Sequence, residues 1–243
     1  MSHAAPQKRH PYDQWSPDAR ALDLVGDKWT LLIVRDLAAG PRRFVELQRV
    51  LPGISTEQLR SRLNRMVADE MLTRKRFREV PPRVEYALTA RARSLMPVLG
   101  ELARWGYEWA WGHPRESEAV DVGAIFRLAP GLIQPNGNSG TVEFRVKHPD
   151  RNNCYSCTIS SAGVQVVECE TRSPDARVVG SETEWVRALS PDRELTALQI
   201  TGDRPLAETL LHDLLAAGPT QSGAEGQINN SHQLQAPVAP VAA

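Results

Sequence analysis

Residues 55–69 read S-T-E-Q-L-R-S-R-L-N-R-M-V-A-D, and the fold of the N-terminal half depends on this stretch. Its apolar residues recur at the spacing of one helical face, namely Leu59, Leu63, Met66 and Val67. That period predicts a single amphipathic helix. Ser55 or Thr56 can cap its first turn, and Gln58 follows Ser55 at the capping-box offset.

The polar face of this predicted helix is rich in hydrogen-bond donors and has no carboxylate between Glu57 and Asp69. Such side chains reach base edges and phosphates. A shorter amphipathic segment, residues 44–51, precedes it across Pro52-Gly53-Ile54, and two helices joined by a short Gly-containing turn predict a helix-turn-helix. The predicted DNA contacts of the second helix are Ser55, Thr56, Gln58, Arg60, Ser61, Arg62, Asn64 and Arg65.

Residues 72–79 and 83–88 alternate as two strands around Pro81 and Pro82, which predicts a hairpin. A helix-turn-helix followed by a hairpin is a winged helix. A solvated charged hairpin is the alternative, but beside a basic helix the positive charge favours contact with a phosphate backbone. The predicted wing contacts are Arg74, Lys75, Arg76, Arg78 and Arg83.

Charge is divided unevenly along the 243 residues, although the net charge is zero. Residues 1–115 hold 20 Lys and Arg against 13 Asp and Glu, a net charge of +7. The remaining residues hold 9 basic and 16 acidic side chains, a net charge of −7. A charged partner responds to the charge of the surface that it contacts and not to the net charge of the whole chain. We therefore expect a basic half that binds DNA and an acidic half that stays away from it.

The composition predicts a cytoplasmic protein. The N-terminus has no signal-peptide core, and no apolar run approaches the length of a membrane span. Three cysteines do not make a disulfide framework. Cys154 and Cys157 would face opposite sides of a strand and could not share a metal, so burial is favoured over a metal or redox site for them and for Cys169. Neither catalytic residues nor cofactors are predicted.

The chain divides by composition into five segments. We expect a disordered N-terminus at residues 1–14, a winged-helix domain at 15–111 and a linker at 112–119. An α+β domain follows at 120–217, and a tail rich in Ala, Pro and Gln, expected to be disordered, occupies 218–243.

The last helix of the first domain, predicted over residues 90–111 with a kink at Pro97, carries excess apolar surface. Dimerisation through it is favoured, since a two-fold protein reads two half-sites; cover by the C-terminal domain is the alternative. The apolar residues are Leu95, Val98, Leu99, Leu102, Trp105, Tyr107, Trp109 and Trp111. Earlier helices are predicted at 17–25, capped by Ser16, and at 28–37, capped by Asp27.

The second half alternates between short strands and helices, which predicts an α+β layer with a five-stranded sheet. The strands are predicted at residues 141–148, 154–160, 164–169, 176–181 and 195–201. The helices are predicted at 122–128, closed by Pro130-Gly131, at 182–189 and at 205–217.

Four motifs in order resemble the HxlR-type winged-helix transcription regulators: W-S-P-D-A-R-A-L-D-L-V-G-D-K-W-T-L-L-I-V-R-D-L, G-P-R-R-F-V-E-L, L-P-G-I-S and P-P-R-V-E-Y-A-L-T. The resemblance covers residues 12–109. It implies homodimers that bind double-stranded operator DNA, with the helix at 55–69 as recognition helix. Many members carry a redox-sensing cysteine where this chain has Ser16, and a hydroxyl cannot take part in thiol–disulfide exchange.

Residues 120–217 resemble a sterol-carrier-protein-type domain through Pro174-Asp175-Ala176, the helix with Trp185, and L-T-A-L-Q-I-T-G-D-R-P-L-A-E-T-L-L. The resemblance implies an apolar cavity and a small apolar effector, with plain core packing as the alternative. The candidate ligand contacts are Phe126, Leu132, Phe144, Trp185, Val186 and Leu189.

Together these features predict a homodimeric, effector-responsive DNA-binding regulator. The alternative function is a lipid or small-molecule carrier whose winged helix serves only for dimerisation or protein interaction. Steep salt dependence of binding would distinguish DNA contact from carriage of an apolar ligand.

Overall fold

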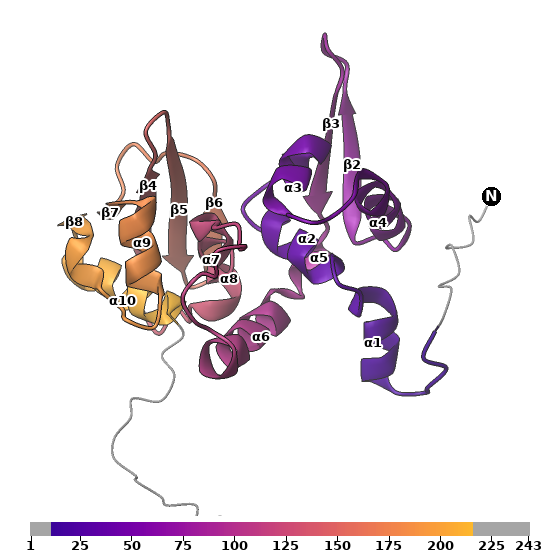
Figure 1. Ribbon diagram of the computed structural model, residues 1–243, viewed down its shortest axis with the longest axis horizontal. Coiled ribbons are helices and arrows are strands. Elements are labelled where there is room, and N and C mark those ends of the chain that lie inside the picture. Colours follow the sequence, from indigo (N-terminus) through magenta and orange to yellow (C-terminus); the bar gives the residue numbers. More distant parts are fainter. Residues whose placement is uncertain (1–10, 216–243) are drawn as a thin grey trace, which may run out of the picture.

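The computed structural model describes residues 11–215, which form two units that pack against each other (Figure 1). The remaining residues of the predicted disordered ends, 1–10 and 218–243, lie outside the described part. No helix between residues 11 and 215 combines the length and apolarity that a membrane crossing requires.

The N-terminal unit has the predicted winged-helix order, and its three strands form an antiparallel sheet in the order β1-β3-β2. The β2–β3 hairpin projects from the body, with α4 beside its base (Figure 1). The elements are α1 (Pro17–Val25), α2 (Thr30–Leu37), β1 (Arg42–Arg43), α3 (Phe44–Val50), α4 (Thr56–Ala68), β2 (Leu72–Phe77), β3 (Arg83–Leu88), α5 (Ala90–Arg93) and α6 (Met96–Trp109).

The C-terminal unit is a five-stranded mixed sheet with helices, in the order β6-β5-β4-β7-β8. Strands β4 and β7 are parallel, and the other neighbours are antiparallel. The elements are α7 (Val122–Phe126), α8 (Ala129–Leu132), β4 (Gly140–Lys147), β5 (Asn152–Ser160), β6 (Gly163–Val167), β7 (Ala176–Ser181), α9 (Glu182–Leu189), the 3₁₀ turn η1 (Leu195–Ala197), β8 (Gln199–Gly202) and α10 (Arg204–Leu214). The five-strand prediction is confirmed, while likeness to a sterol carrier stays a prediction.

The two faces of this sheet differ in polarity because side chains alternate along each strand. On β4, Val142, Phe144 and Val146 are buried in the core that α7, α9 and α10 share. Between them, Glu143 and Arg145 occupy the other face, 2.9 Å apart between Nη2 and Oε1. One apolar face therefore carries the core of the C-terminal unit.

Two predicted helices end or divide at a proline. The helix expected over residues 90–111 is two helices, because α5 ends at Arg93 and Pro97 lies in the first turn of α6. Proline is favoured there since its missing N–H leaves no helical bond unmade. The helix expected at 122–128 ends at Phe126, and Pro130 lies in the first turn of a further helix, α8, where a closing turn was expected.

The predicted fifth strand, residues 195–201, is also shorter than expected. The amide of Leu198 donates to the carbonyl of Leu195 at 3.0 Å, which closes a tight 3₁₀ turn over Leu195–Ala197. Pairing with β7 begins only at Gln199. Local turn formation therefore replaces the first half of the strand.

Helix α6 divides its apolar residues between two surfaces. Leu99 is buried in the N-terminal core, and Tyr107 packs against the C-terminal core, where burial raises the pKa of its phenol to about 12. The outward residues Val98, Leu102, Trp105 and Trp109 lie at helical spacing and are 51–68% exposed. The C-terminal unit thus covers part of the predicted apolar excess, and a second stripe stays exposed. We call Val98, Leu102, Trp105 and Trp109 the α6 stripe.

The two units approach most closely where α6 crosses α8. A Cβ added to Gly100 would lie 2.0 Å from the carbonyl oxygen of Gly131, and a Cβ added to Gly131 would lie 2.1 Å from that of Met96. Only glycine permits this contact between backbones. Nearby, Arg104 donates to the carbonyl of Leu132 at 2.8 Å.

A buried arginine joins the units beside this crossing. Arg127, just after α7, is 1% exposed, and its Nη1 donates to Oδ1 of Asp36 on α2 at 3.2 Å and to Oδ2 of Asp121 at 2.7 Å. Its Nη2 lies 3.3 Å from the hydroxyl of Tyr155. Burial opposes the charged form, but the neighbouring carboxylates outweigh it and raise the pKa of the Arg127 guanidinium.

A second set of contacts ties the loop after α2 to the end of β6. Arg42 pairs with Glu168 and donates from Nε to the carbonyl of Asp36 at 2.8 Å. The amide of Glu168 donates to the carbonyl of Ala39 at 3.3 Å. Ion pairs and backbone bonds therefore fix the C-terminal unit on the winged helix.

We predict that Gly100→Ala lowers the free energy of unfolding by about 1–3 kcal/mol, because its Cβ overlaps the Gly131 backbone. Gly106→Ala on the same helix is the matched control. Nothing lies within 4 Å of its Cβ, so we expect a gain of about 0.5–1 kcal/mol from helix propensity. Urea unfolding followed by tryptophan fluorescence measures both, and equal effects would contradict the close crossing.

We predict that Arg127→Met destabilises the protein by about 3 kcal/mol, because it leaves the buried Asp36 with Arg35 as its remaining charged partner. The double variant Asp36→Asn/Arg127→Met removes both charges and should recover part of the loss. Chemical denaturation of the three proteins tests the pair. A double variant no more stable than Arg127→Met would argue against a direct interaction.

Candidate nucleic-acid interface

Helix α4 begins at the predicted capping box. The Ser55 hydroxyl accepts from the Gln58 amide at 3.2 Å, and the Gln58 side chain accepts from the Ser55 amide at 3.1 Å. Leu59, Leu63 and Met66 are buried, as the apolar stripe predicted. The cap and the stripe together fix which face of α4 is turned to solvent.

The predicted DNA-contacting residues of α4 fall into two groups. Arg62 and Arg65 are half-buried: Arg62 Nη1 lies 3.0 Å from Oδ2 of Asp27, and Arg65 Nε lies 3.8 Å from Oδ2 of Asp69. Both guanidinium groups therefore contact carboxylates of their own domain. The exposed group consists of Ser55, Thr56, Gln58, Arg60, Ser61 and Asn64.

The wing hairpin has two different faces, which its register defines. Residues directly opposite each other share a face, so Arg74 and Arg76 lie with Tyr86 and Val84. The other face holds Lys75, Phe77, Arg83 and Glu85. There Arg83 stacks 4.3 Å from the Phe77 ring centroid and pairs with Glu85 at 3.1 Å. Arg78 is exposed beyond the end of β2.

A groove of about 330 Å³ separates α4 from the first of these faces. Arg60 and Asn64 from α4 meet Arg74 from β2 across it. The groove is lined by Phe44, Arg60, Asn64, Arg74, Val84 and Tyr86. Donors of two separate elements thus converge on one solvent-open surface, with apolar side chains as its floor.

Arg60 also pairs with Glu57 one turn earlier on the exposed side of α4. An exposed pair of this kind contributes only about 0–1 kcal/mol, so a stronger anion can displace the carboxylate. The guanidinium of Arg60 therefore remains available to a phosphate or a base edge.

The six predicted ligand-binding residues lie together in the C-terminal core. The Phe126 ring is 4.9 Å from that of Phe144, stacked, and 4.9 Å from that of Trp185, edge-on. Leu132 and Leu189 are buried and Val186 is half-buried. They form a packed aromatic and aliphatic cluster, and a ligand-binding role for them stays a prediction.

The three cysteines are free thiols in different environments. Cys157 is buried on the core face of β5, opposite Val142, and burial raises its pKa to about 12. Cys154 lies opposite Arg145 on the other face, as predicted. The burial predicted for Cys169 is wrong, because this residue lies beyond the end of β6 and is exposed. Within residues 11–215, no three His, Cys, Asp or Glu side chains gather as a metal site would require.

Comparison with known proteins identifies the family of the N-terminal unit. The HxlR-like helix-turn-helix family matches residues 24–113. An HTH-type transcriptional regulator of Synechocystis sp. is 41% identical over 93 residues, which cover 38% of this chain and 69% of the relative. The chain belongs to the HxlR-like helix-turn-helix family.

Two further HxlR-like comparisons agree. An HTH-type transcriptional regulator of Halalkalibacterium halodurans is 43% identical over 94 residues, covering 38% of this chain and 83% of the relative. Another, from Bacillus subtilis, is 38% identical over 96 residues, covering 40% of this chain and 81% of the relative. The HxlR-like match ends at residue 113, before the five-stranded sheet begins.

The apolar part of the groove lining, formed by Phe44, Val84 and Tyr86, was not predicted. The alternation of β3 contained the signal, because Val84 and Tyr86 lie opposite Arg76 and Arg74 once the hairpin register is fixed. The direction taken by Arg62 had no comparable signal, since Asp27 comes from a distant loop. That of Arg65 did have one, because Asp69 follows it at the i,i+4 spacing of a helical ion pair.

Proposed function

We propose that this protein is a DNA-binding transcription regulator that grips operator DNA between α4 and the wing. The main support for this proposal is the groove in which Arg60 and Asn64 of α4 face Arg74 of β2. A helix in the major groove supplies base contacts, and a flanking basic hairpin supplies phosphate contacts. Family membership supports the same conclusion.

Within this proposal the predicted contacts divide by exposure. The exposed residues of α4 and the Arg74–Arg76 face of the wing contact the duplex directly. Arg62 and Arg65 remain proposed contacts, but each must first leave a carboxylate of its own domain. Lys75, Arg78 and Arg83 add positive charge near the backbone.

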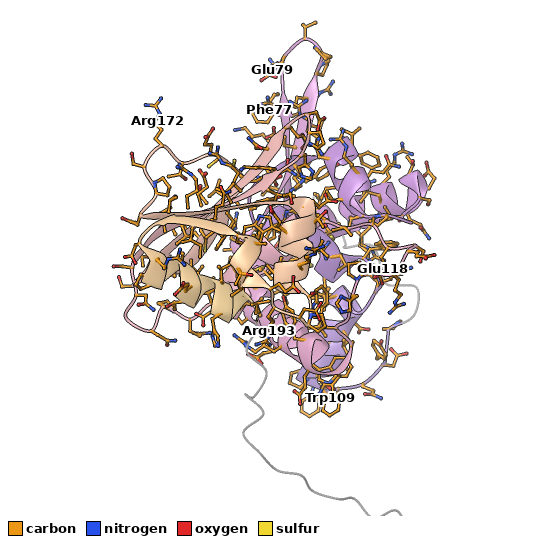
Figure 2. All side chains as sticks on the ribbon, turned by 60° about the vertical axis from the view of Figure 1, so that its left-hand side comes forward. Phe77, Glu79, Trp109, Glu118, Arg172 and Arg193 are labelled. Atoms are coloured by element: carbon orange, nitrogen blue, oxygen red, sulfur yellow. The ribbon has the colours of Figure 1, made fainter. Side chains whose placement is uncertain are left out.

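We further propose that two copies associate through the α6 stripe. Four large apolar side chains on one face of a helix are typical of an interface. Phe77 of the wing and Trp109 of the stripe lie at opposite ends of the molecule (Figure 2). Dimerisation there leaves both wings free to reach half-sites.

The C-terminal unit is proposed as a sensing domain. Asp36 lies on α2, which contacts α3 of the helix-turn-helix, and Arg127 fixes the sheet to that same helix. A small apolar effector that repacks the cluster of Phe126, Phe144 and Trp185 would shift the population of domain arrangements.

Arg60→Ala and Arg74→Ala test the DNA interface. Duplexes are first selected from a random-sequence pool with the wild-type protein, and the variants are then titrated in mobility-shift assays. We expect Arg60→Ala to cost about 1–3 kcal/mol if the contact is bidentate to a base, and Arg74→Ala to lower the salt slope by about 1.

The matched control is Arg187→Ala, an exposed arginine on α9 of the C-terminal unit. It should leave affinity for the selected duplex unchanged. If no duplex is bound even at low salt, the carrier function with a winged helix used only for association replaces the regulator. If all three variants bind the duplex as tightly as the wild type, the groove between α4 and the wing is not the DNA interface.

Leu102→Glu tests the α6 stripe. A carboxylate buried in an apolar interface is strongly unfavourable, so we expect the variant to sediment as a monomer at concentrations where the wild type is dimeric. Val45→Glu is the matched control, because Val45 is 59% exposed on α3 outside the stripe. Unchanged sedimentation of Leu102→Glu, or a monomeric wild type, would contradict the proposed interface.

A further inference from the structure

A polar cleft of about 650 Å³ lies between the two units. Its volume is typical of a site for a drug-sized molecule. The winged-helix side of the cleft comes from residues 39–52 around the start of α3, and the other side comes from residues 119–127 and the sheet. None of the six residues of the apolar cluster lines this cleft, so it is a separate candidate site.

The carboxylates that line the cleft already have partners. Glu168 pairs with Arg42, and Asp121 accepts from Arg127. The side chain of Glu46 accepts from the amide at the start of α3, and that of Glu182 lies 3.5 Å from a ring nitrogen of the histidine that follows β4. Arginines therefore pair with Glu168 and Asp121, whereas Glu46 and Glu182 keep their negative charge on these walls.

Two arginines of the cleft have no such partner. Arg49, exposed on α3, and Arg151, exposed in the β4–β5 turn, make no side-chain hydrogen bond or ion pair with any residue in the range 11–215. The buried Nε of Arg127, which also borders the cleft, has no hydrogen-bond partner there either. Among the described residues, each unit thus contributes one unpaired guanidinium to the lining, Arg49 from the winged helix and Arg151 from the sheet domain.

Apolar side chains lie on the same walls. Val120 is 40% exposed and Val167 is 46% exposed, and both line the cleft beside Val50 and Val122. A ligand that uses the cleft fully therefore needs an anionic group for the arginines and an apolar body for the valines.

We propose that this cleft binds a small amphipathic organic anion, whose acidic group is held by Arg49 of the winged helix and Arg151 of the sheet domain. A carboxylate accepts charge-assisted hydrogen bonds from guanidinium groups. Because the two arginines belong to different units, the bound anion bridges them and favours one arrangement of the domains. A change in DNA affinity would follow from this domain arrangement, and that consequence rests on the proposed function. The binding of the anion itself does not.

Binding is tested by titration calorimetry on the full chain at low salt, without DNA. The probes are 4-phenylbutyrate, 4-phenylbutan-1-ol and 4-phenylbutylamine, which share one apolar body. We expect saturable binding of the carboxylate, with the alcohol and the ammonium weaker by about tenfold or more, as the loss of a charged hydrogen bond predicts. Equal affinity for the alcohol, or no saturable heat with the carboxylate, would overturn the proposal.

Substitutions of the two arginines test whether the anion binds in this cleft. Arg49→Gln/Arg151→Gln should weaken 4-phenylbutyrate binding by about tenfold or more, and unchanged circular dichroism melting shows that the fold persists. Arg172→Gln is the control, because Arg172 is exposed on the same domain outside the cleft (Figure 2). Equal binding by the double variant and the wild type would refute the site.

Titration with a DNA duplex distinguishes the cleft proposal from the proposed DNA-binding function. If Arg49→Gln weakens duplex binding as Arg60→Ala does and leaves 4-phenylbutyrate affinity unchanged, Arg49 belongs to the nucleic-acid surface and the cleft proposal fails. If calorimetry shows saturable 4-phenylbutyrate binding while no duplex is bound, the cleft proposal is supported and the regulator function is contradicted.

Discussion

The arrangement of the two units depends on the buried contact between Arg127 and Asp36. Removing a guanidinium from water is costly unless several acceptors replace its hydration. Here the acceptors come from both units, since Asp36 belongs to the winged helix while Asp121 and Tyr155 belong to the sheet domain. Satisfying this one side chain therefore requires the two units to be docked, and docking places the sheet domain against the helix that supports the helix-turn-helix.

The opposite net charges of the two halves act at two places. At the wing and α4, the positive charge of the first half is exposed, where counterions or phosphates can meet it. At the junction, basic and acidic residues of opposite halves meet directly, as in the pair of Arg42 with Glu168. The exposed positive charge of the first half thus favours attraction of a polyanion, whereas the junction holds ion pairs of both polarities, since Arg127 of the second half pairs with Asp36 of the first.

Local signals were enough to predict the DNA-side architecture. The capping box at Ser55 and the alternation of the hairpin each act within a few residues, and both appear in the structure. Arg127 and Asp36 are 91 residues apart in the sequence, so no local periodic pattern could predict their ion pair. The exposure of the α4 arginines likewise depends on a residue far away in the sequence. Arg62 is half-buried because it pairs with Asp27, while Arg60 is exposed.

The hydrogen bond between the Glu168 amide and the Ala39 carbonyl has a consequence for self-association. Strand β6 is an edge of the five-stranded sheet, and an uncovered edge is a template to which a strand from another chain can add. The loop after α2 occupies the end of that edge, and α8 packs beside it. Excising the winged helix would therefore leave a sheet domain prone to edge-to-edge aggregation.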